Sequence, residues 1–387
     1  MTPKILFYVQ HLQGVGHVFR ATRIVRALVD RGFEVDIAFG GTPVPGLDVG
    51  AARLHFLPPV RAGAEVFNRL EDADGNPVGD AYKDRRRDAL LELFERTAPD
   101  IVMTEAFPFG RRQMRFELMP LMEAAARRAP RPLVVASVRD ILQRNRKPER
   151  DAEVVELVNG HFDHVLVHGD PALVRLEETF PHAGAIASKV VYTGIVAPEA
   201  PDASREGERF DVIVSVGGGA FGFDLLKAAV RAKPLTSLRD GCWLVLTGLR
   251  TSEAERAELE ALNAHGVTFR DFAPDLPRLL AQAKLSVSRA GYNTVADVFA
   301  CGCRAVVIPF TDGIETEQIR RAELLAARGL AQTLPPERET PPELAAAIER
   351  ALQAPPPGPA ALRLDGARST AKILWRLAHG QPIDDLV

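Results

Sequence analysis

The 387-residue sequence has few of the features that mark secreted, membrane-spanning or nucleic-acid-binding proteins. Its three cysteines, Cys242, Cys301 and Cys303, are too few for a disulfide framework. No apolar run approaches the roughly 18 residues of a membrane-spanning helix, and the apolar stretch 5–9 is too short for a signal peptide. Neither charge dominates, because 48 Lys and Arg stand against 51 Asp and Glu. We therefore expect a cytoplasmic, reduced protein with no membrane span and no nucleic-acid partner.

Short apolar runs rich in β-branched residues alternate with longer amphipathic stretches along the chain. Such runs are typical of parallel strands that are buried on both faces. They predict strands over residues 5–9, 35–38, 101–103, 133–136, 165–167, 212–216, 244–246, 267–269, 285–287 and 305–308. The stretches between them predict helices, for example 18–30, where Ile24, Val25 and Leu28 share one face. The alternation favours an α/β fold with doubly wound parallel sheets.

The chain length and one polar segment rich in Pro and Glu divide this pattern into two domains. We predict a Rossmann-like domain over residues 1–197, a linker over 198–209, a second Rossmann-like domain over 210–365 and a C-terminal helix within 366–387. Ligands of such sheets bind beyond the carboxyl ends of the strands. We expect the two domains to face each other across a cleft, with the functional residues directly after strands.

A loop with two glycines follows the first predicted strand. Gly14 and Gly16 allow a tight turn and a close approach of the backbone to a ligand. His17 begins the next helix, where the helix dipole favours the neutral imidazole that a general base requires. Arg20 lies one turn further on and could face an anionic group. The alternative is a glycine-rich turn with a capping histidine, and NAD binding is disfavoured because the third glycine of its fingerprint is missing.

Charged residues also follow two other predicted strands of the first half. Glu105 follows strand 101–103, and Arg139 and Asp140 follow strand 133–136. Their position predicts that they line the ligand-binding edge of the sheet. The alternative is a salt bridge within the domain between an acid and Arg111 or Arg112.

The second half carries two turns suited to an anion. Gly217, Gly218 and Gly219 follow strand 212–216 and expose backbone N–H groups, most plausibly to phosphate. A second turn holds Arg289 and Gly291 and leads into a helix that begins at Tyr292, Asn293 and Thr294. The N–H groups of this first helical turn also point outward.

Three further side chains in this region suit a sugar nucleotide. Asp297 follows Asn293 by one helical turn, which places a carboxylate where it can bind a diol such as ribose. Glu317 and Gln318 follow another strand and offer hydrogen bonds to sugar hydroxyls. Groups that bind phosphate, diol and polyol along one edge of a sheet indicate a nucleotide-sugar pocket.

Residues 288–318 resemble the C-terminal donor-binding region of the family 28 glycosyltransferases, and residues 14–19 resemble the glycine loop of that family. The resemblance is nearest to a less characterised branch of predicted glycosyltransferases. It implies a GT-B fold and inverting transfer of a hexose or N-acetylhexosamine from a UDP-sugar to an acceptor hydroxyl, without metal or cofactor. The acceptor stays open between a small molecule, a glycan and a lipid-linked compound, with peripheral membrane contact in the last case.

The resemblance also implies a role for each matching residue. His17 is the base, with Glu105 as second choice. On the donor side, Phe272 and Ala273 flank the uracil, Thr294 contacts the diphosphate, Asp297 binds the ribose, Glu317 and Gln318 bind the sugar, and Gly218 and Gly219 approach it by their backbone. The loop glycines Gly14 and Gly16 and the turn residues Arg289, Gly291, Tyr292 and Asn293 complete this set, while Arg20, Arg139 and Asp140 lie on the acceptor side. The family usually has Glu where this chain has Asp297.

Other signals are interpreted as structural. The acidic pair Asp72 and Asp74 lies in a polar loop, and the cysteines have no companion ligands, so no metal site is predicted. His161, His164 and His168 straddle one strand, and residues 83–88 form a charged helix face. Two other functions remain open: a UDP-sugar epimerase or hydrolase on the same fold, and a noncatalytic protein that binds nucleotide sugars.

Overall fold

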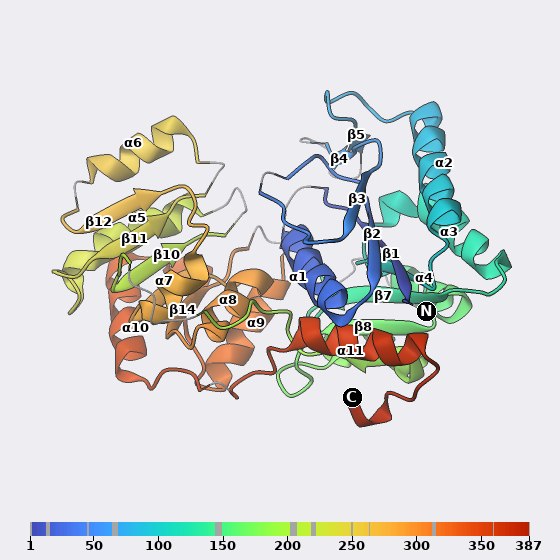
Figure 1. Ribbon diagram of the computed structural model, residues 1–387. Coiled ribbons are helices and arrows are strands. Elements are labelled where there is room, and N and C mark those ends of the chain that lie inside the picture. Colours follow the sequence, from blue (N-terminus) through green and yellow to red (C-terminus); the bar gives the residue numbers. More distant parts are fainter. Residues whose placement is uncertain are drawn as a thin grey trace. The chain divides into compact units, whose positions relative to one another are not determined.

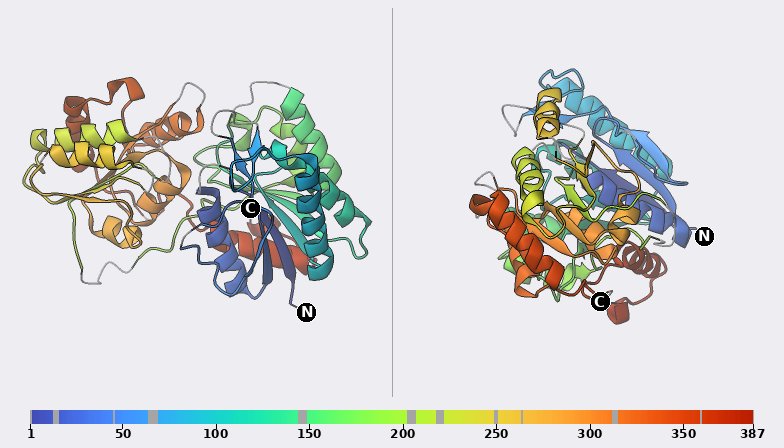
Figure 2. Two further views of the ribbon diagram at one scale, coloured as in Figure 1. Left: turned by 90° about the horizontal axis from the view of Figure 1, so that it is seen from above. Right: turned by 90° about the vertical axis from the view of Figure 1, so that its left-hand side faces the viewer.

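The computed structural model describes residues 2–12, 16–44, 46–63, 69–143, 149–201, 207–217, 222–248, 251–262, 264–311, 315–358 and 360–386. The chain folds into two compact units (Figure 1). The first comprises Met1–Val196 together with Asp365–Val387, and the second is Ala197–Leu364. Each unit has its own parallel sheet with helices on both faces (Figure 2).

The first unit is built on a seven-stranded parallel sheet of order β3-β2-β1-β6-β7-β8-β9. Its strands are β1 (Lys4–Val9), β2 (Glu34–Phe39), β3 (Arg53–Phe56), β6 (Ile101–Glu105), β7 (Leu133–Arg139), β8 (His164–His168) and β9 (Val190–Tyr192). A separate antiparallel pair is formed by β4 (Arg61–Ala62) and β5 (Leu70–Glu71). The helices are α1 (Gly16–Arg31), α2 (Asp80–Thr97), α3 (Arg115–Arg127), α4 (Glu149–His161) and α11 (Gly366–Ala378).

Alternation along the strands sends side chains to two cores, one on each face of this sheet. Leu6 and Tyr8 of β1 join the core formed with α2, α3 and α4. Helices α1 and α11 pack against each other outside that core (Figure 1). The last helix therefore belongs to the first unit, where the ring of Trp375 lies 5.4 Å from that of Phe33.

The second unit repeats this plan with a six-stranded parallel sheet of order β12-β11-β10-β13-β14-β15. Its strands are β10 (Val212–Ser215), β11 (Trp243–Leu246), β12 (Val267–Arg270), β13 (Leu285–Arg289), β14 (Ala305–Ile308) and β15 (Gln332–Thr333). Its helices are α5 (Phe223–Ala232), α6 (Glu253–Ala261), α7 (Leu276–Gln282), α8 (Tyr292–Ala300), α9 (Glu317–Ala327) and α10 (Pro341–Gln353). Helices α5, α6 and α10 share one core with the strands, while the buried residues of α7, α8 and α9 lie outside it.

Both strand orders reverse direction at one point, which is where α/β sheets bind ligands. In the first sheet this point lies between β1 and β6, and in the second it lies between β10 and β13. The predicted doubly wound α/β fold is thus confirmed, and every strand predicted from an apolar run is present. The short strands β3, β9 and β15 were not predicted.

The interpretation of residues 83–88 as a charged helix face is wrong for Arg86. The guanidinium of Arg86 is completely buried on the side of α2 that faces the core, and its Nε donates to Glu117 Oε2 at 2.6 Å. Its Nη2 donates to Gln10 Oε1 at 2.6 Å, and its Nη1 donates to the carbonyl oxygen of Gly40 at 2.8 Å. Glu117 also accepts a hydrogen bond from the hydroxyl of Tyr8. Arg86 therefore joins α2 to α3 and to the ends of β1 and β2.

Candidate functional site

At the switch point of the first sheet, two predicted residues meet. His17 stands in the first turn of α1, and Glu105 is the last residue of β6. His17 Nδ1 lies 2.9 Å from Glu105 Oε1, and the same oxygen forms an ion pair with Arg20. Glu105 is completely buried, whereas the side chain of His17 keeps 20% of its surface exposed.

Burial and charge set the protonation of this pair. Burial, helped by the charge of Arg111, lowers the pKa of His17 to about 3, although its bond to Glu105 acts in the other direction. Burial alone would raise the pKa of Glu105, but the charge of Arg20 and the hydrogen bond from His17 outweigh it and lower that pKa to about 2. A neutral imidazole beside an ionised carboxylate holds its proton on Nδ1, which leaves the lone pair of Nε2 available as a base.

The hydrogen bonds of Glu105 argue against its choice as the alternative base. Both oxygens of this completely buried carboxylate already accept hydrogen bonds, from His17, Arg20 and Ser137, so neither is directed at an acceptor hydroxyl. Its hydrogen bond with Nδ1 of His17 instead suits Glu105 to hold the imidazole ring in a fixed orientation.

More positive charge gathers around this pair. Arg111 has a left-handed backbone conformation, with φ 59°, and its Nε donates to the carbonyl oxygen of Gln10 at 2.9 Å. Burial and the charges of Arg139 and Arg20 lower the pKa of Arg111 to about 10, against the attraction of Glu105. The salt bridge that the sequence left open as the alternative therefore forms between Glu105 and Arg20, not between Glu105 and Arg111 or Arg112. Arg112 lies 3.3 Å from Glu153 instead.

The predicted acceptor residues Arg139 and Asp140 lie at the end of the neighbouring strand β7. Arg139 is half-buried, and Asp140 is only 2% exposed. Asp140 Oδ1 accepts a hydrogen bond from the backbone nitrogen of Ile141 at 2.8 Å. A Cβ added to Gly169 would lie 2.7 Å from Asp140 Cβ, so the loops after β7 and β8 pack closely.

A buried polar chain that the sequence did not reveal continues from Glu105. Ser137 of β7 donates to Glu105 Oε2 at 3.0 Å, and its Oγ lies 2.9 Å from Nε2 of His168. His168 Nδ1 lies 2.8 Å from Thr193 Oγ1. The available signal was that polar residues end several neighbouring strands, but only the sheet order shows that they touch.

In the second sheet, glycines gather at the switch point. A Cβ added to Gly217 would lie 3.5 Å from Thr294 Oγ1, and one added to Gly291 would lie 3.9 Å from the same atom. Gly217 has φ +73° and Gly248 has φ +90°, which favour glycine. The turns after β10, β11 and β13 therefore converge on the start of α8. Gly14, Gly218 and Gly219 lie outside the described residues.

Ion pairs fix the turn before α8. Arg289 Nη1 donates to Glu339 Oε2 at 2.6 Å, and its Nη2 donates to Oε1 at 3.1 Å. Arg321 donates to the carbonyl oxygen of Ala290 at 2.9 Å and to Glu317 Oε1 at 2.7 Å. The predicted donor residues Arg289 and Glu317 are thus both buried and engaged in ion pairs within the unit.

The remaining predicted donor residues occupy the same edge or the helices that begin there. Tyr292 is buried with Arg321 over its ring, and Asn293 and Asp297 are half-buried on α8. The ring of Phe272 is 58% exposed after β12, while Ala273 beside it is buried. Gln318 Oε1 accepts from the backbone nitrogen of Phe310 at 3.1 Å.

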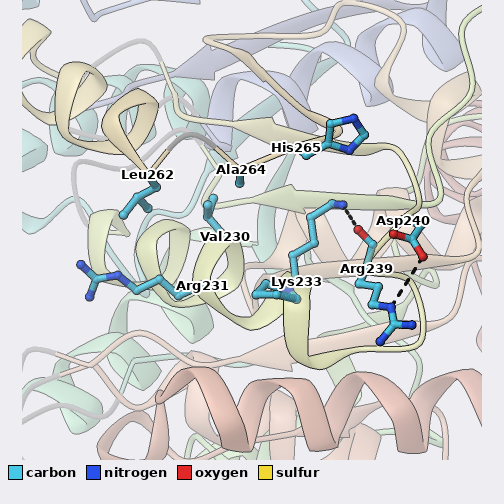
Figure 3. A pocket seen from close by; sticks show the side chains of 9 residues that line it. Val230, Arg231, Lys233, Arg239, Asp240, Leu262, Ala264 and His265 are labelled. Carbon is cyan, nitrogen blue, oxygen red and sulfur yellow. Dashed lines mark hydrogen bonds and ion pairs between the residues drawn. The ribbon is translucent and has the colours of Figure 1, made fainter.

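A cavity of about 470 Å³ lies elsewhere in the second unit (Figure 3). Its lining comes from the end of α5 and from the segments that precede β11 and β12, at the amino ends of the strands. Lys233 donates to the carbonyl oxygen of Arg239, and Arg239 lies 3.6 Å from Asp240. None of the predicted site residues that the structure describes lines this cavity, so we assign it no part in the site.

Comparisons with solved structures define the class of fold. The glycotransferase of kitacinnamycin superposes with a TM-score of 0.62 at 16% identity, covering 100% of this chain and 97% of the other. MurG of Acinetobacter baumannii superposes with a TM-score of 0.58 at 17% identity, covering 98% of this chain and 100% of the other. The fold is that of the GT-B glycosyltransferases, as predicted.

Sequence comparisons relate the chain to one family of glycosyltransferases. Residues 213–364 match the model of the glycosyltransferase family 28 C-terminal domain. The UDP-N-acetylglucosamine--N-acetylmuramyl-(pentapeptide) pyrophosphoryl-undecaprenol N-acetylglucosamine transferase of Brucella anthropi is 29% identical over 215 residues, or 52% of this chain and 55% of that protein. This confirms the predicted family 28-like character, although the chain spans about half the length of the curated relatives it matches.

Proposed function

We propose that this protein is a glycosyltransferase that moves a hexose or N-acetylhexosamine from a UDP-sugar to an acceptor hydroxyl, with inversion and without metal. The observation that carries the proposal is the match of residues 213–364 to the family 28 C-terminal domain, together with the switch-point position of the glycines and the start of α8. The His17–Glu105 pair supplies the base that such a transfer requires.

The chemical step is a single displacement. The acceptor oxygen attacks the anomeric carbon of the donor, while the bond from that carbon to the diphosphate oxygen breaks. The acceptor proton passes to Nε2 of His17, and Glu105 stabilises the resulting imidazolium. UDP leaves with the bonding electrons, and its developing charge is stabilised by N–H groups at the start of α8 and in the turn after β10.

The acceptor belongs on the side of the first unit. Arg20 Nη2 lies 3.3 Å from His17 Nδ1, and Arg139 and Asp140 lie at the carboxyl end of β7, the strand next to β6. A ligand bound to these residues would place its hydroxyl on the side of the base. The name of the Brucella anthropi relative supports a lipid-linked acceptor and a UDP-N-acetylglucosamine donor. Among the described residues, no helix is long and apolar enough to cross a membrane.

The first test is donor binding. We expect UDP titrated into the full chain to bind, and Asp297→Ala to weaken its affinity about 10-fold to 100-fold, because a hydrogen bond to a charged group is worth about 1.5–3 kcal/mol. Isothermal titration calorimetry measures both affinities. The control is Asp240→Ala, which changes an exposed residue beside the cavity at the amino ends of the strands. It should leave the UDP affinity unchanged. Absence of UDP binding to the wild type would contradict the proposal.

The second test concerns the turn after β10. Gly217→Ala puts a Cβ on a residue with φ +73°, which costs about 1–2 kcal/mol, so we expect UDP affinity to fall about 5-fold to 30-fold as the turn relaxes. Gly358→Ala is the control, because nothing lies within 4 Å of its added Cβ. Equal UDP affinity in both variants would show that this turn does not contribute to the donor site.

Turnover distinguishes the proposal from the other two functions. The transferase should release UDP from UDP-N-acetylglucosamine only when a suitable acceptor is present, at a rate that follows acceptor concentration. Rapid UDP release or isomer formation without acceptor would indicate a hydrolase or an epimerase. Tight binding without turnover across an acceptor panel of sugars, glycans and lipid-linked diphosphates would indicate a noncatalytic protein.

A further inference from the structure

We propose that Ser137 and His168 are positioning residues for the base, because they hold Glu105 in the orientation that keeps the proton of His17 on Nδ1 and its lone pair on Nε2. The proposal rests on the proposed role of His17 in glycosyl transfer. Neither Ser137 nor His168 needs to touch a substrate, and both act through Glu105.

The sheet itself brings the chain of groups together. In the parallel register Glu105 of β6 pairs with Ser137 of β7, and Arg139 of β7 pairs with His168 of β8. Thr193 follows β9, and its backbone nitrogen donates to the carbonyl oxygen of Val167 at 3.0 Å. The polar chain therefore crosses the carboxyl ends of β6, β7 and β8 and ends beside β9.

Every member of this chain beyond His17 is completely buried. Glu105, Ser137, His168 and Thr193 each have 0% of their surface exposed. Buried polar groups are costly unless they are hydrogen-bonded, and apolar side chains would fill the same space at lower cost. Three successive contacts of 3.0, 2.9 and 2.8 Å join these groups into one network that leads to the base.

The ionised carboxylate determines the direction of each hydrogen bond. Glu105 can only accept, so the one hydroxyl hydrogen of Ser137 points to Oε2. Ser137 Oγ must then accept from His168, which assigns the hydrogen of that ring to Nε2. Because burial and the charge of Arg20 lower the pKa of His168 to about 3, its ring is neutral and Nδ1 accepts from the hydroxyl of Thr193.

The chain therefore delivers one hydrogen to Oε2 of the Glu105 carboxylate. Ser137 occupies Oε2, which leaves Oε1 to face His17 Nδ1 and Arg20. Without His168, the hydroxyl of Ser137 loses the donor that sets its rotation. Without Ser137, Oε2 loses its hydrogen bond and the carboxylate is free to rotate. In both cases His17 can hold its proton on either nitrogen, and only one of the two forms can accept the acceptor proton.

Four variants of the full chain test the proposal. Ser137→Ala and His168→Phe remove the hydrogen bonds and keep the bulk, while Ser137→Thr retains the hydroxyl. Ser286→Ala, in a buried serine of the second sheet, is the matched control. We expect the first two to lower kcat about 10-fold to 100-fold, the usual effect of losing an outer partner of a functional histidine, with little change in KM for the UDP-sugar. Ser137→Thr should recover most of kcat, and the control should match the wild type.

A second measurement separates this proposal from the proposed function. Nitrogen-15 NMR of the histidine rings at pH 7 reports the tautomer of His17 in the absence of any substrate. The wild type should show a single tautomer with hydrogen on Nδ1, and Ser137→Ala and His168→Phe should show a mixture. Folding of each variant is checked by circular dichroism and by the urea unfolding midpoint of the first unit.

Each combination of results is decisive. An unchanged His17 tautomer in folded Ser137→Ala and His168→Phe overturns the positioning role, even if transferase activity is present. A tautomer mixture in a protein without transferase activity supports the positioning role while the proposed function fails. Loss of kcat that Ser137→Thr does not recover, without a change in tautomer, shows a role in packing only and also overturns the proposal.

Discussion

His17→Ala is expected to lower kcat for sugar transfer roughly a thousandfold, within the range of about 10²- to 10⁴-fold that general-base catalysis contributes. The variant removes the imidazole whose Nδ1 donates to the ionised, buried carboxylate of Glu105 and whose Nε2 carries the lone pair that takes the proton. Glu105 keeps its contacts with Arg20 and Ser137, so the fold should survive the substitution. UDP affinity should not change, because the proposed donor residues that carry side chains all belong to the second unit and His17 is not one of them.

The pH dependence follows from the sign of the pKa shift. A base is active when deprotonated, and a His17 pKa of about 3, below the ordinary 6.5, keeps the ring neutral from pH 8 down to pH 5. We therefore expect kcat of the wild type to show no loss attributable to His17 over this range and to fall only as the pH approaches 4. His182→Ala, in an exposed histidine of the same unit, is the control. A decline of kcat centred near pH 6.5, or a His17→Ala variant as active as the control, would contradict the assignment.

The central strands of both sheets could be predicted because they are buried on both faces. Residues 212–215 and 305–308 carry only apolar residues and one serine, a pattern that few other structures produce. The edge strand β3 reads Arg-Leu-His-Phe and is half-exposed, so it lacks such a run. Strand β15 has only two residues and no apolar side chain. Predictions from continuous apolar runs therefore recover the centre of both sheets and, of the edge strands, only β12.

The candidate site likewise contains residues that the sequence indicates and residues that only the structure reveals. The proximity of His17 and Glu105 could be predicted, because His17 follows the glycine loop after β1, Glu105 ends β6, and the ends of these two strands are neighbours in a doubly wound sheet. Ser137 lies near the end of β7 and His168 ends β8, but their importance depends on a contact across 31 residues of sequence. Composition and spacing carry no information on which of several polar strand ends share a hydrogen bond. The interpretation of His168 as structural therefore lacked the one fact that links it to the site.

Arg86 illustrates the same limit in a charged segment. Three consecutive arginines at 85–87 span about 200° of the helix surface, because successive residues are about 100° apart, so one of them can turn toward the core. The sequence does not indicate which of them turns inward, since the partner, Glu117, is 31 residues away on α3. Only the packing of α2 against α3 identifies Arg86 as the buried member.

Glu117→Ala is expected to destabilise the first unit by about 3–5 kcal/mol, the usual cost of leaving a buried charge without its partner. Glu117 has no exposed surface and holds two nitrogens of Arg86, at 2.6 and 3.0 Å. The other hydrogen bonds that Arg86 donates among the described residues go to neutral oxygens, which cannot balance its charge; these belong to Tyr8, Gln10, Gly40 and Pro58. The double variant Arg86→Met/Glu117→Leu removes both charges and should recover much of the loss.

The same helix supplies the control for this experiment. Glu123 of α3 pairs with Arg127 at 3.7 Å, but their side chains are 57% and 72% exposed, so Glu123→Ala should change stability by less than about 1 kcal/mol. Each unit holds one of the two tryptophans, Trp375 in the first and Trp243 in the second. In a Trp243→Phe background, fluorescence during urea unfolding reports the first unit alone, which avoids treating two units as one transition. Equal midpoints for Glu117→Ala and Glu123→Ala would mean that the buried ion pair adds no more than an exposed one, and that the charge of Arg86 is balanced by its carbonyl partners after all.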